Sequence, residues 1–143
     1  NELGHFREWD EGREQDWNLL DYPLHSGFLA FHRALNHCYL TAPALWRDEG
    51  EGSFTWLLQG EEGTFAFLRQ GGGQCLLAVF NFLDRAQEAS IFLGGAGGLS
   101  LLLDSDSALF GGGTQGAPEP PEVEGDVVRL TLPPYSGRLY QVE

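Results

Sequence analysis

The chain has 143 residues, 42% of them hydrophobic, and its 21 acidic residues face 8 basic ones, all arginine, for a formal net charge of −13. Such acidity excludes the basic surface that nucleic acids and anionic membranes require, so a neutral sugar or another protein is the expected partner. Ten Phe, four Trp and four Tyr provide enough apolar surface for a core and exclude a disordered chain.

Residues 1–21 are charged and aromatic without a clear period, and we expect them to form a long loop. An amphipathic helix over 22–40 follows, with Asp21 placed to cap it and Pro23 suited to its first position. Apolar residues recur at spacings of four and three along one face. They are Leu24, Phe28, Phe31, Leu35 and Cys38. The helix is expected to end before Pro43, because proline cannot continue it.

Short strands separated by glycine turns are predicted after Trp46. Their ranges are 54–58, 64–69, 75–82, 88–93, 99–103, 128–132 and 137–142. The segment 75–82 is almost continuously apolar, which is typical of a central strand covered on both faces. Residues 104–126 hold six carboxylates, three prolines and no cation, and are predicted to form a solvated loop. The predicted fold class is mainly β: an antiparallel β-sandwich preceded by a loop and one helix.

Several residues invite a catalytic or metal-binding interpretation, and each has a simpler one. The glycine runs lack the Lys-Ser or Lys-Thr of a phosphate loop and open no helix, so they are predicted turns. His25 and His32 lie seven residues apart, about two helical turns, which is too far to share one metal ion without a third ligand between them. All four histidines are therefore expected to be surface or packing residues, and neither a metal nor a cofactor is predicted.

Two further pairs are better explained structurally. Asp104 and Asp106 share a strand face, but neighbouring carboxylates at a strand end more often cap the next turn than form a glycosidase pair. Cys38 and Cys75 fall in different predicted elements and are expected to be free, buried thiols, with a disulfide as the alternative.

The opening loop differs from the rest because it sets charged groups among Trp rings. Its notable residues are Glu2, His5, Arg7, Glu8, Trp9, Asp16 and Trp17. A sugar site combines aromatic rings for the apolar sugar face with hydrogen-bonding groups for the hydroxyls. The alternative is a solvated loop whose tryptophans pack on the helix, and residue types alone favour that alternative.

Several stretches follow one another in a recognisable order. They are NELG and REW within residues 1–9, DWNLL at 16–20, DYPLHSGFLAFHRALN at 21–36, PALW at 43–46, LLAVFNF at 76–82, LLLDSDSALFGGG at 101–113 and LTLPPYSG at 130–137. Taken together they resemble the bacterial 1,4-α-glucan (glycogen) branching enzymes of the α-amylase superfamily. The resemblance covers essentially the whole chain.

The resemblance implies that residues 1–46 are the tail of a (β/α)8 catalytic barrel, a loop and its last helix. Residues 47–143 would then be the C-terminal all-β sandwich domain. Such an enzyme cleaves α-1,4-glucan chains and transfers them to form α-1,6 branches during cytoplasmic glycogen synthesis. Its catalytic carboxylates lie in motifs upstream of the residues present here, so no catalytic residue is expected and the fragment alone should be inactive.

Loops that follow barrel strands line the catalytic face. Four loop residues are therefore expected to border the substrate cleft: Glu2, Arg7, Glu8 and Trp9. The α-glucan would be bound through the parent enzyme, and the chain's own barrel would be its main protein contact. A helix that has lost its barrel neighbours leaves apolar surface uncovered. The isolated chain is therefore expected to self-associate through helix 22–40, or to have residues 1–20 poorly ordered.

Two other hypotheses stay open at this point. In the first, the β-domain is itself a glucan-binding module, with Trp56, Tyr135 and Tyr140 as candidate sugar contacts. In the second, the chain is the tail of another α-amylase superfamily enzyme, such as a trehalose-releasing or a debranching enzyme.

Overall fold

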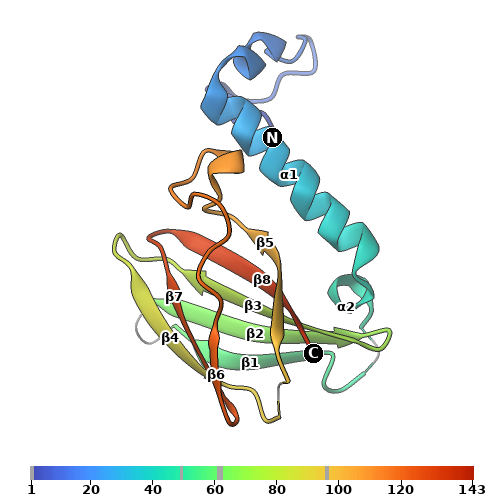
Figure 1. The fold of residues 1–143 in the computed structure, drawn as a ribbon. Coiled ribbons are helices and arrows are strands. Elements are labelled where there is room, and N and C mark those ends of the chain that lie inside the picture. Colours follow the sequence, from blue (N-terminus) through green and yellow to red (C-terminus); the bar gives the residue numbers. More distant parts are fainter. Residues whose placement is uncertain (1, 49, 61–62, 96) are drawn as a thin grey trace.

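The computed structural model describes residues 2–48, 50–60, 63–95 and 97–143 (Figure 1). Its helical elements ahead of the strands are η1 (Trp17–Asp21), α1 (Pro23–Thr41) and α2 (Pro43–Trp46). Helix α1 begins at Pro23 and ends before Pro43, as predicted. The expected Asp21 cap is wrong: Asp21 closes η1, and Tyr22 stands at the N-cap position without a side-chain cap.

The strands form two antiparallel sheets, which confirms the mainly β fold class. One sheet contains β1 (Phe54–Gln59), β2 (Thr64–Gly71), β3 (Gln74–Asn81), β8 (Ser136–Val142) and β5 (Leu99–Asp104), in that order. The other contains β4 (Gln87–Phe92), β7 (Val127–Leu132) and β6 (Glu122–Glu124). Strand β6 lies in the segment predicted to be a loop; its three residues pair with β7, and Glu124 forms an ion pair with Arg129.

Most of the space between the sheets is filled by apolar side chains. Leu77 and Val79 of β3 pack in one cluster with Ile91 of β4 and Val128 of β7, and each side chain is at most 1% exposed. Full burial of a side chain of this size stabilises the fold by ~1.5–3 kcal/mol relative to exposure. This layer is therefore the main source of the sandwich's stability.

A second apolar cluster covers the outer face of the five-stranded sheet. Leu76 and Ala78 of β3 and Leu139 of β8 pack there against Ala42 and Ala44, at the start of α2. Successive strand residues point to opposite faces. Strand β3 is consequently buried on both sides, which confirms the prediction made from its continuous apolar sequence.

Helix α2 is fastened to this face by Arg69 of β2. The Arg69 Nε donates to the Ala44 carbonyl oxygen at 3.0 Å, and its Nη2 donates to the Asp48 carboxylate at 2.7 Å. A guanidinium at the carbonyl end of a helix satisfies groups that have no partner within the helix.

Helix α1 is held to the sandwich by the segment around η2 (Ala108–Phe110). Gly27 of α1 is buried, and a Cβ placed on it would lie 2.6 Å from the Phe110 carbonyl oxygen. The rings of Phe31 and Phe110 meet edge to face with centroids 5.5 Å apart. Figure 1 shows α1 extending past this contact, so the N-terminal loop lies at the end remote from α2.

The η2 segment is shaped by the two aspartates that the sequence placed on one strand face. Asp104 accepts a hydrogen bond from the Asp106 backbone N–H at 3.0 Å. Asp106 accepts from the Gly113 N–H at 3.1 Å and from the Thr114 hydroxyl at 2.6 Å. Both carboxylates therefore cap turns, which confirms the structural interpretation over the catalytic one.

Candidate functional site

The loop over residues 2–16 folds back onto the start of α1. Leu3 is buried, and its carbonyl oxygen accepts a hydrogen bond from His25 Nδ1 at 2.7 Å. Leu19, in η1 just after the loop, is buried as well. The buried side chains of Leu3 and Leu19 and the His25 hydrogen bond anchor the loop at both ends, and most residues between them are exposed.

An arginine–aspartate fork closes the loop on itself. Arg7 donates from Nε to Asp16 Oδ2 at 2.8 Å and from Nη2 to Asp16 Oδ1 at 3.0 Å. The same Nη2 also donates to the Glu14 carbonyl oxygen at 2.7 Å. Two parallel hydrogen bonds fix the relative orientation of guanidinium and carboxylate. The fork therefore brings together backbone segments that are nine residues apart.

Asp16 receives a third contact, because His5 Nδ1 lies 3.2 Å from its Oδ2. Hydrogen bonds from Arg7 and His5 to the charged carboxylate lower the pKa of Asp16 from 3.8 to about 2. The same fork raises the pKa of Arg7 above its ordinary value. Both groups are therefore charged at neutral pH, and the loop is closed by an intact ion pair.

A second, smaller ion pair shapes the tip of the loop. Arg13 Nε lies 3.1 Å from Asp10 Oδ2, and Asp10 Oδ1 accepts from the Gly12 backbone N–H at 2.9 Å. A carboxylate that binds a backbone N–H two residues later closes an Asx turn. This turn reverses the chain and sets the wall that faces Arg7.

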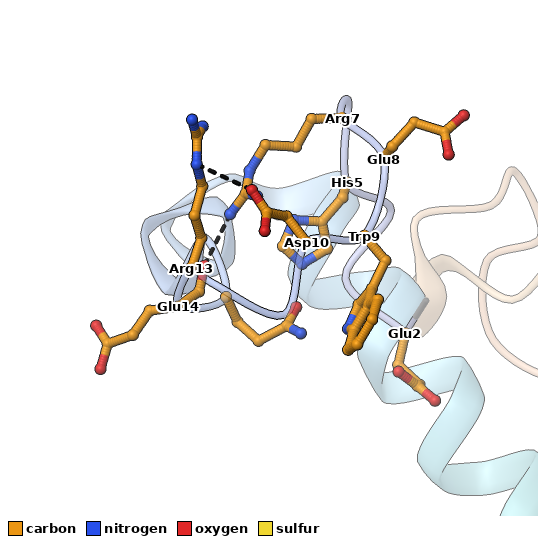
Figure 2. Close-up of a pocket in the computed structure, with 9 residues that line it drawn as sticks. Glu2, His5, Arg7, Glu8, Trp9, Asp10, Arg13 and Glu14 are labelled. Carbon is orange, nitrogen blue, oxygen red and sulfur yellow. Dashed lines mark hydrogen bonds and ion pairs between the residues drawn. The ribbon is translucent and has the colours of Figure 1, made fainter.

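The folded loop forms a pocket of about 350 Å³, and Arg7 and the Asp10–Arg13 pair are among its lining residues (Figure 2). Its lining residues are Glu2, His5, Arg7, Glu8, Trp9, Asp10, Arg13, Glu14 and Gln15. All four residues predicted to border a cleft thus line one cavity. Trp9 is 75% exposed, and Figure 2 shows its indole next to Glu2.

The pocket has the chemistry to hold a neutral, hydroxylated ligand. An exposed indole offers a flat apolar face for a sugar ring. The carboxylates of Glu2, Glu8 and Glu14 supply acceptors for hydroxyl groups at the rim, while Arg7 and Arg13 supply donors. The lining thus combines an apolar ring with charged groups, as a site for a hydroxylated ligand requires.

Sequence reasoning left part of this lining out. Asp10, Arg13 and Glu14 were not among the predicted cleft residues, although the spacing of Asp10 and Arg13 by three residues is a local signal for an ion pair. Asp16 was noted as part of the loop but not as its organiser. No local pattern indicates that it pairs with Arg7, since that contact spans nine residues.

The three aromatic residues proposed as glucan contacts on the β-domain do not come together. Trp56 lies on the outer face of β1 and is 47% exposed, whereas Tyr135 lies in the turn before β8. Tyr140 is 1% exposed and belongs to the apolar cluster between the sheets. Its side chain is therefore core and offers no surface to a sugar.

Two of the four histidines pack against neighbouring residues, while His5 lines the pocket and His37 is exposed. His25 bonds the Leu3 carbonyl, and His32 lies edge-on to the Phe28 ring with centroids 4.5 Å apart. Cys38 and Cys75 are free thiols, as predicted, but both are half-buried rather than buried, and partial burial raises the pKa of Cys38. In the described parts of the chain, no group of three or more His, Cys, Asp or Glu side chains is placed to hold a metal ion.

Comparison with known families decides the assignment of the fold. The family model for the α-amylase C-terminal all-β domain matches residues 56–143. The chain belongs to this family. The match begins within β1 and runs through β8, so it covers both sheets and the η2 segment.

Comparison with curated relatives extends the similarity of this chain toward its N-terminus. The chain is 38% identical over 143 aligned residues to the 1,4-alpha-glucan branching enzyme GlgB of Salinibacter ruber, covering 93% of this chain and 23% of that protein. It is 37% identical over 152 aligned residues to GlgB 1 of Rhizobium etli, covering 99% of this chain and 20% of that protein. The chain thus spans about a fifth of the length of the relatives it matches.

Solved structures support the fold alone. An α-amylase from H. orenii superposes with a TM-score of 0.56 at 20% identity, covering 81% of this chain and 20% of that one. The trehalulose synthase MutB of Pseudomonas mesoacidophila gives a TM-score of 0.55 at 22% identity, with 81% and 18% covered. Separately, no helix in the described ranges is long and apolar enough to cross a membrane.

Proposed function

We propose that this chain is the C-terminal part of a cytoplasmic 1,4-α-glucan branching enzyme, which cleaves α-1,4-glucan chains and rejoins them as α-1,6 branches. One observation carries the proposal. Similarity to branching enzymes extends over 93–99% of the chain, whereas the model of the C-terminal domain family matches only residues 56–143. The similarity therefore continues far to the N-terminal side of that domain. The loop that forms the pocket and helix α1 therefore belong to the similar region.

In this proposal, the two parts of the chain have different tasks. Loop 2–16 borders the α-glucan cleft and contacts the substrate through Trp9 and the rim carboxylates, while the bond-breaking carboxylates lie outside this chain. The sandwich supports the barrel to which α1 belongs. Trehalose-releasing and debranching enzymes remain the alternatives, but the relatives cited above carry the name of branching enzymes.

A graft tests whether this chain can serve as the C-terminal part of a branching enzyme. The chain replaces the matching 23% of the S. ruber enzyme, and formation of α-1,6 branches from linear α-glucan is measured. We expect the graft to branch glucan. In the graft, Trp9→Ala should raise KM for the glucan about tenfold, the size expected for one aromatic contact.

The matched control is Trp17→Ala, since Trp17 is also exposed but does not line the pocket. It should leave KM unchanged. A folded graft that forms no branches would contradict the proposal that this chain belongs to a branching enzyme. Equal effects of the two tryptophan substitutions would contradict the role given to the loop.

Self-association of the isolated chain through α1 stays a prediction. Leu24 is 71% exposed, and Phe28 and Leu35 are each 39% exposed, so part of the apolar face of α1 is open to solvent. Such a surface is suited to a partner that covers it, and the barrel of the parent enzyme is the partner we propose.

A further inference from the structure

The turn that precedes β8 holds one residue in a backbone conformation that side chains rarely adopt. Tyr135 has a φ of 48°, and it is the only non-glycine residue with a positive φ in the described parts of the chain. This left-handed region strains any residue that has a Cβ, and glycine and asparagine tolerate it best. Strain of this kind is found at functional sites when the surroundings enforce it.

Hydrogen bonds on both sides of Tyr135 enforce the turn. The Tyr135 backbone N–H donates to the Leu83 carbonyl oxygen at 3.0 Å. Asn81, which is 1% exposed, donates from Nδ2 to the Pro133 carbonyl oxygen at 2.8 Å. The Ser136 hydroxyl donates to the same oxygen at 2.7 Å. The conformation of Tyr135 is therefore imposed by its neighbours.

The side chain of Tyr135 does not repay this strain through burial, because it is 71% exposed. The hydrogen bond to Leu83 comes from the backbone, so any residue except proline could make it at this position. Asparagine or glycine would adopt the turn with less strain. The aromatic ring is therefore better explained by a ligand that it meets than by the stability of the turn.

A groove of about 700 Å³ opens beside this turn, and ~300–1,000 Å³ is usual for ligand sites. Pro133 and Pro134, the two residues before Tyr135, line it. The rest of the lining comes mostly from β4, from β7 and from the segment between η2 and β6. Its polar residues include Glu88, Ser90, Glu119, Glu122, Arg129 and Thr131. Tyr135 thus stands next to a polar groove.

The charges of the groove favour a neutral, hydroxylated ligand. Arg129 forms an ion pair with Glu124. Arg138, at the floor of the groove, pairs with Asp104, and both side chains are almost fully buried. Both guanidinium charges are therefore compensated, and the three carboxylates of the lining would repel an anion. No group of three or more His, Cys, Asp or Glu in the described ranges is placed to hold a metal ion.

An exposed aromatic ring beside a polar groove is the combination that binds a sugar. The ring covers the apolar face of the sugar, while carboxylates and hydroxyls of the groove bond its hydroxyl groups. We infer that Tyr135 and this groove form a second glucan-binding site, on the sandwich and separate from the pocket of loop 2–16. The inference rests on the proposed function for the choice of an α-1,4-glucan among neutral sugars.

Such a site has a task that the pocket of loop 2–16 does not have. It makes and breaks no bond; it holds one part of a long glucan while another part is free to reach the cleft of the parent enzyme. Tethering of this kind raises the effective concentration of the glucan at the cleft.

The first test follows the tyrosines of the isolated chain by ¹⁹F NMR after incorporation of 3-fluorotyrosine. The chain has four tyrosines, and Tyr135→Phe identifies the Tyr135 signal by its loss. Maltohexaose should shift that signal in a saturable manner, while the signal of Tyr39 on α1 stays in place. Sodium phosphate at the same concentration should shift neither signal.

A second test uses Tyr135→Asn, which removes the ring and relieves the strain. This variant should raise Tm by a few degrees. Its Kd for maltohexaose should rise about tenfold, the size expected for one aromatic contact, as measured from the amide signals of Ser90 and Thr131 in the ¹⁵N-labelled chain. The matched control is Tyr39→Asn, since Tyr39 is 51% exposed but lies in a helix. It should neither raise Tm nor change Kd.

A Tyr135 signal that maltohexaose does not shift, or that phosphate shifts equally, would overturn the inference. Unchanged binding in Tyr135→Asn would overturn it as well. Should that variant not fold, Tyr135→Leu keeps the bulk without the flat ring, and its binding should be weakened to the same extent. None of these measurements needs catalysis. A graft that forms no branches would therefore count against the proposed function alone, and a branching graft whose Tyr135 binds no glucan would count against this inference alone.

Discussion

The sandwich and the N-terminal loop each contain an arginine–aspartate pair, and the pairs differ in surroundings more than in geometry. Arg138 Nε lies 3.1 Å from Asp104 Oδ2, and the two side chains are 5% and 4% exposed. Arg7 Nε lies 2.8 Å from Asp16 Oδ2, with side chains 32% and 37% exposed. Water screens the Arg7–Asp16 pair, although its distance is the shorter of the two. Burial rather than distance therefore decides how much each pair matters for the stability of the fold.

The pairs also connect different things. Asp104 lies on β5 and Arg138 on β8, and Arg138 Nη1 donates to the Thr131 carbonyl oxygen of β7 at 3.0 Å. The buried pair therefore links the two sheets. The pair of Arg7 and Asp16 joins two points of one loop and shapes a pocket. Loss of the buried pair should therefore lower the stability of the whole fold, whereas loss of the loop pair should change only the structure of the loop.

The largest effect is expected for Arg138→Leu. This change leaves the Asp104 carboxylate buried without its partner, which should lower the free energy of unfolding by ~3–5 kcal/mol. Urea denaturation of the isolated chain measures it. The matched change in the exposed pair, Arg7→Leu, should leave the urea midpoint nearly unchanged.

A double variant separates charge from packing in this result. Arg138→Leu combined with Asp104→Leu removes both buried charges and should regain part of the lost stability. If the double variant is no more stable than Arg138→Leu alone, packing rather than the unpaired charge is responsible. Equal losses for Arg138→Leu and Arg7→Leu would break the contrast between the two regions.

A smaller loss is expected for Gly27→Ala, at the junction between the two regions. Alanine in place of glycine within a helix ordinarily stabilises it by ~0.5–1 kcal/mol. Here the new methyl would lie 2.6 Å from the Phe110 carbonyl oxygen, and such overpacking costs ~1–3 kcal/mol. The sum is a net loss of about 1 kcal/mol, seen as a lower Tm. Asn36→Ala, at an exposed position of α1, should instead raise Tm slightly.

The smallest effect on overall stability is expected for Asp16, where pH gives the test. Its pKa is lowered from 3.8 to about 2, so the loop is stabilised above about pH 4 and loses that support as pH falls toward 2. Trp9 fluorescence, measured with the other three tryptophans replaced by Phe, should change in this acidic range. Asp16→Asn should show the acid signal already at pH 7, with an unchanged urea midpoint. A pH-independent signal in the parent chain would exclude the Asp16 fork as the closing contact.

Helix α1 and most strands could be predicted because their signals are local. The spacing of apolar residues located the helix, and the continuous apolar stretch of β3 indicated burial on both faces. Strand β6 was missed because three acidic and β-branched residues beside prolines carry no signal of their own. Pairing with β7 makes them a strand.

The pocket was predicted only in part, because some of its lining depends on contacts between residues that no local pattern connects. The resemblance to branching enzymes, which places the loop after a barrel strand, marked Glu2, Arg7, Glu8 and Trp9 as one group, whereas residue types alone favoured a solvated loop. Tyr140 shows the opposite outcome. From the sequence, an aromatic residue in a terminal strand is compatible with either a surface or a core position. The register of β8 against β3 places the Tyr140 side chain in the core.

By itself, the sequence determined the order of elements, the β class of the second part and the family to which the chain belongs. These depend on periodicity, turn residues and motif order, which are properties of neighbouring positions. Tertiary structure alone decided which carboxylate meets which arginine. It also decided that five aromatic side chains from β1, β2 and β3 meet on one face with Phe82, which follows β3. Such contacts depend on how strands far apart in sequence pair, and no local pattern records that.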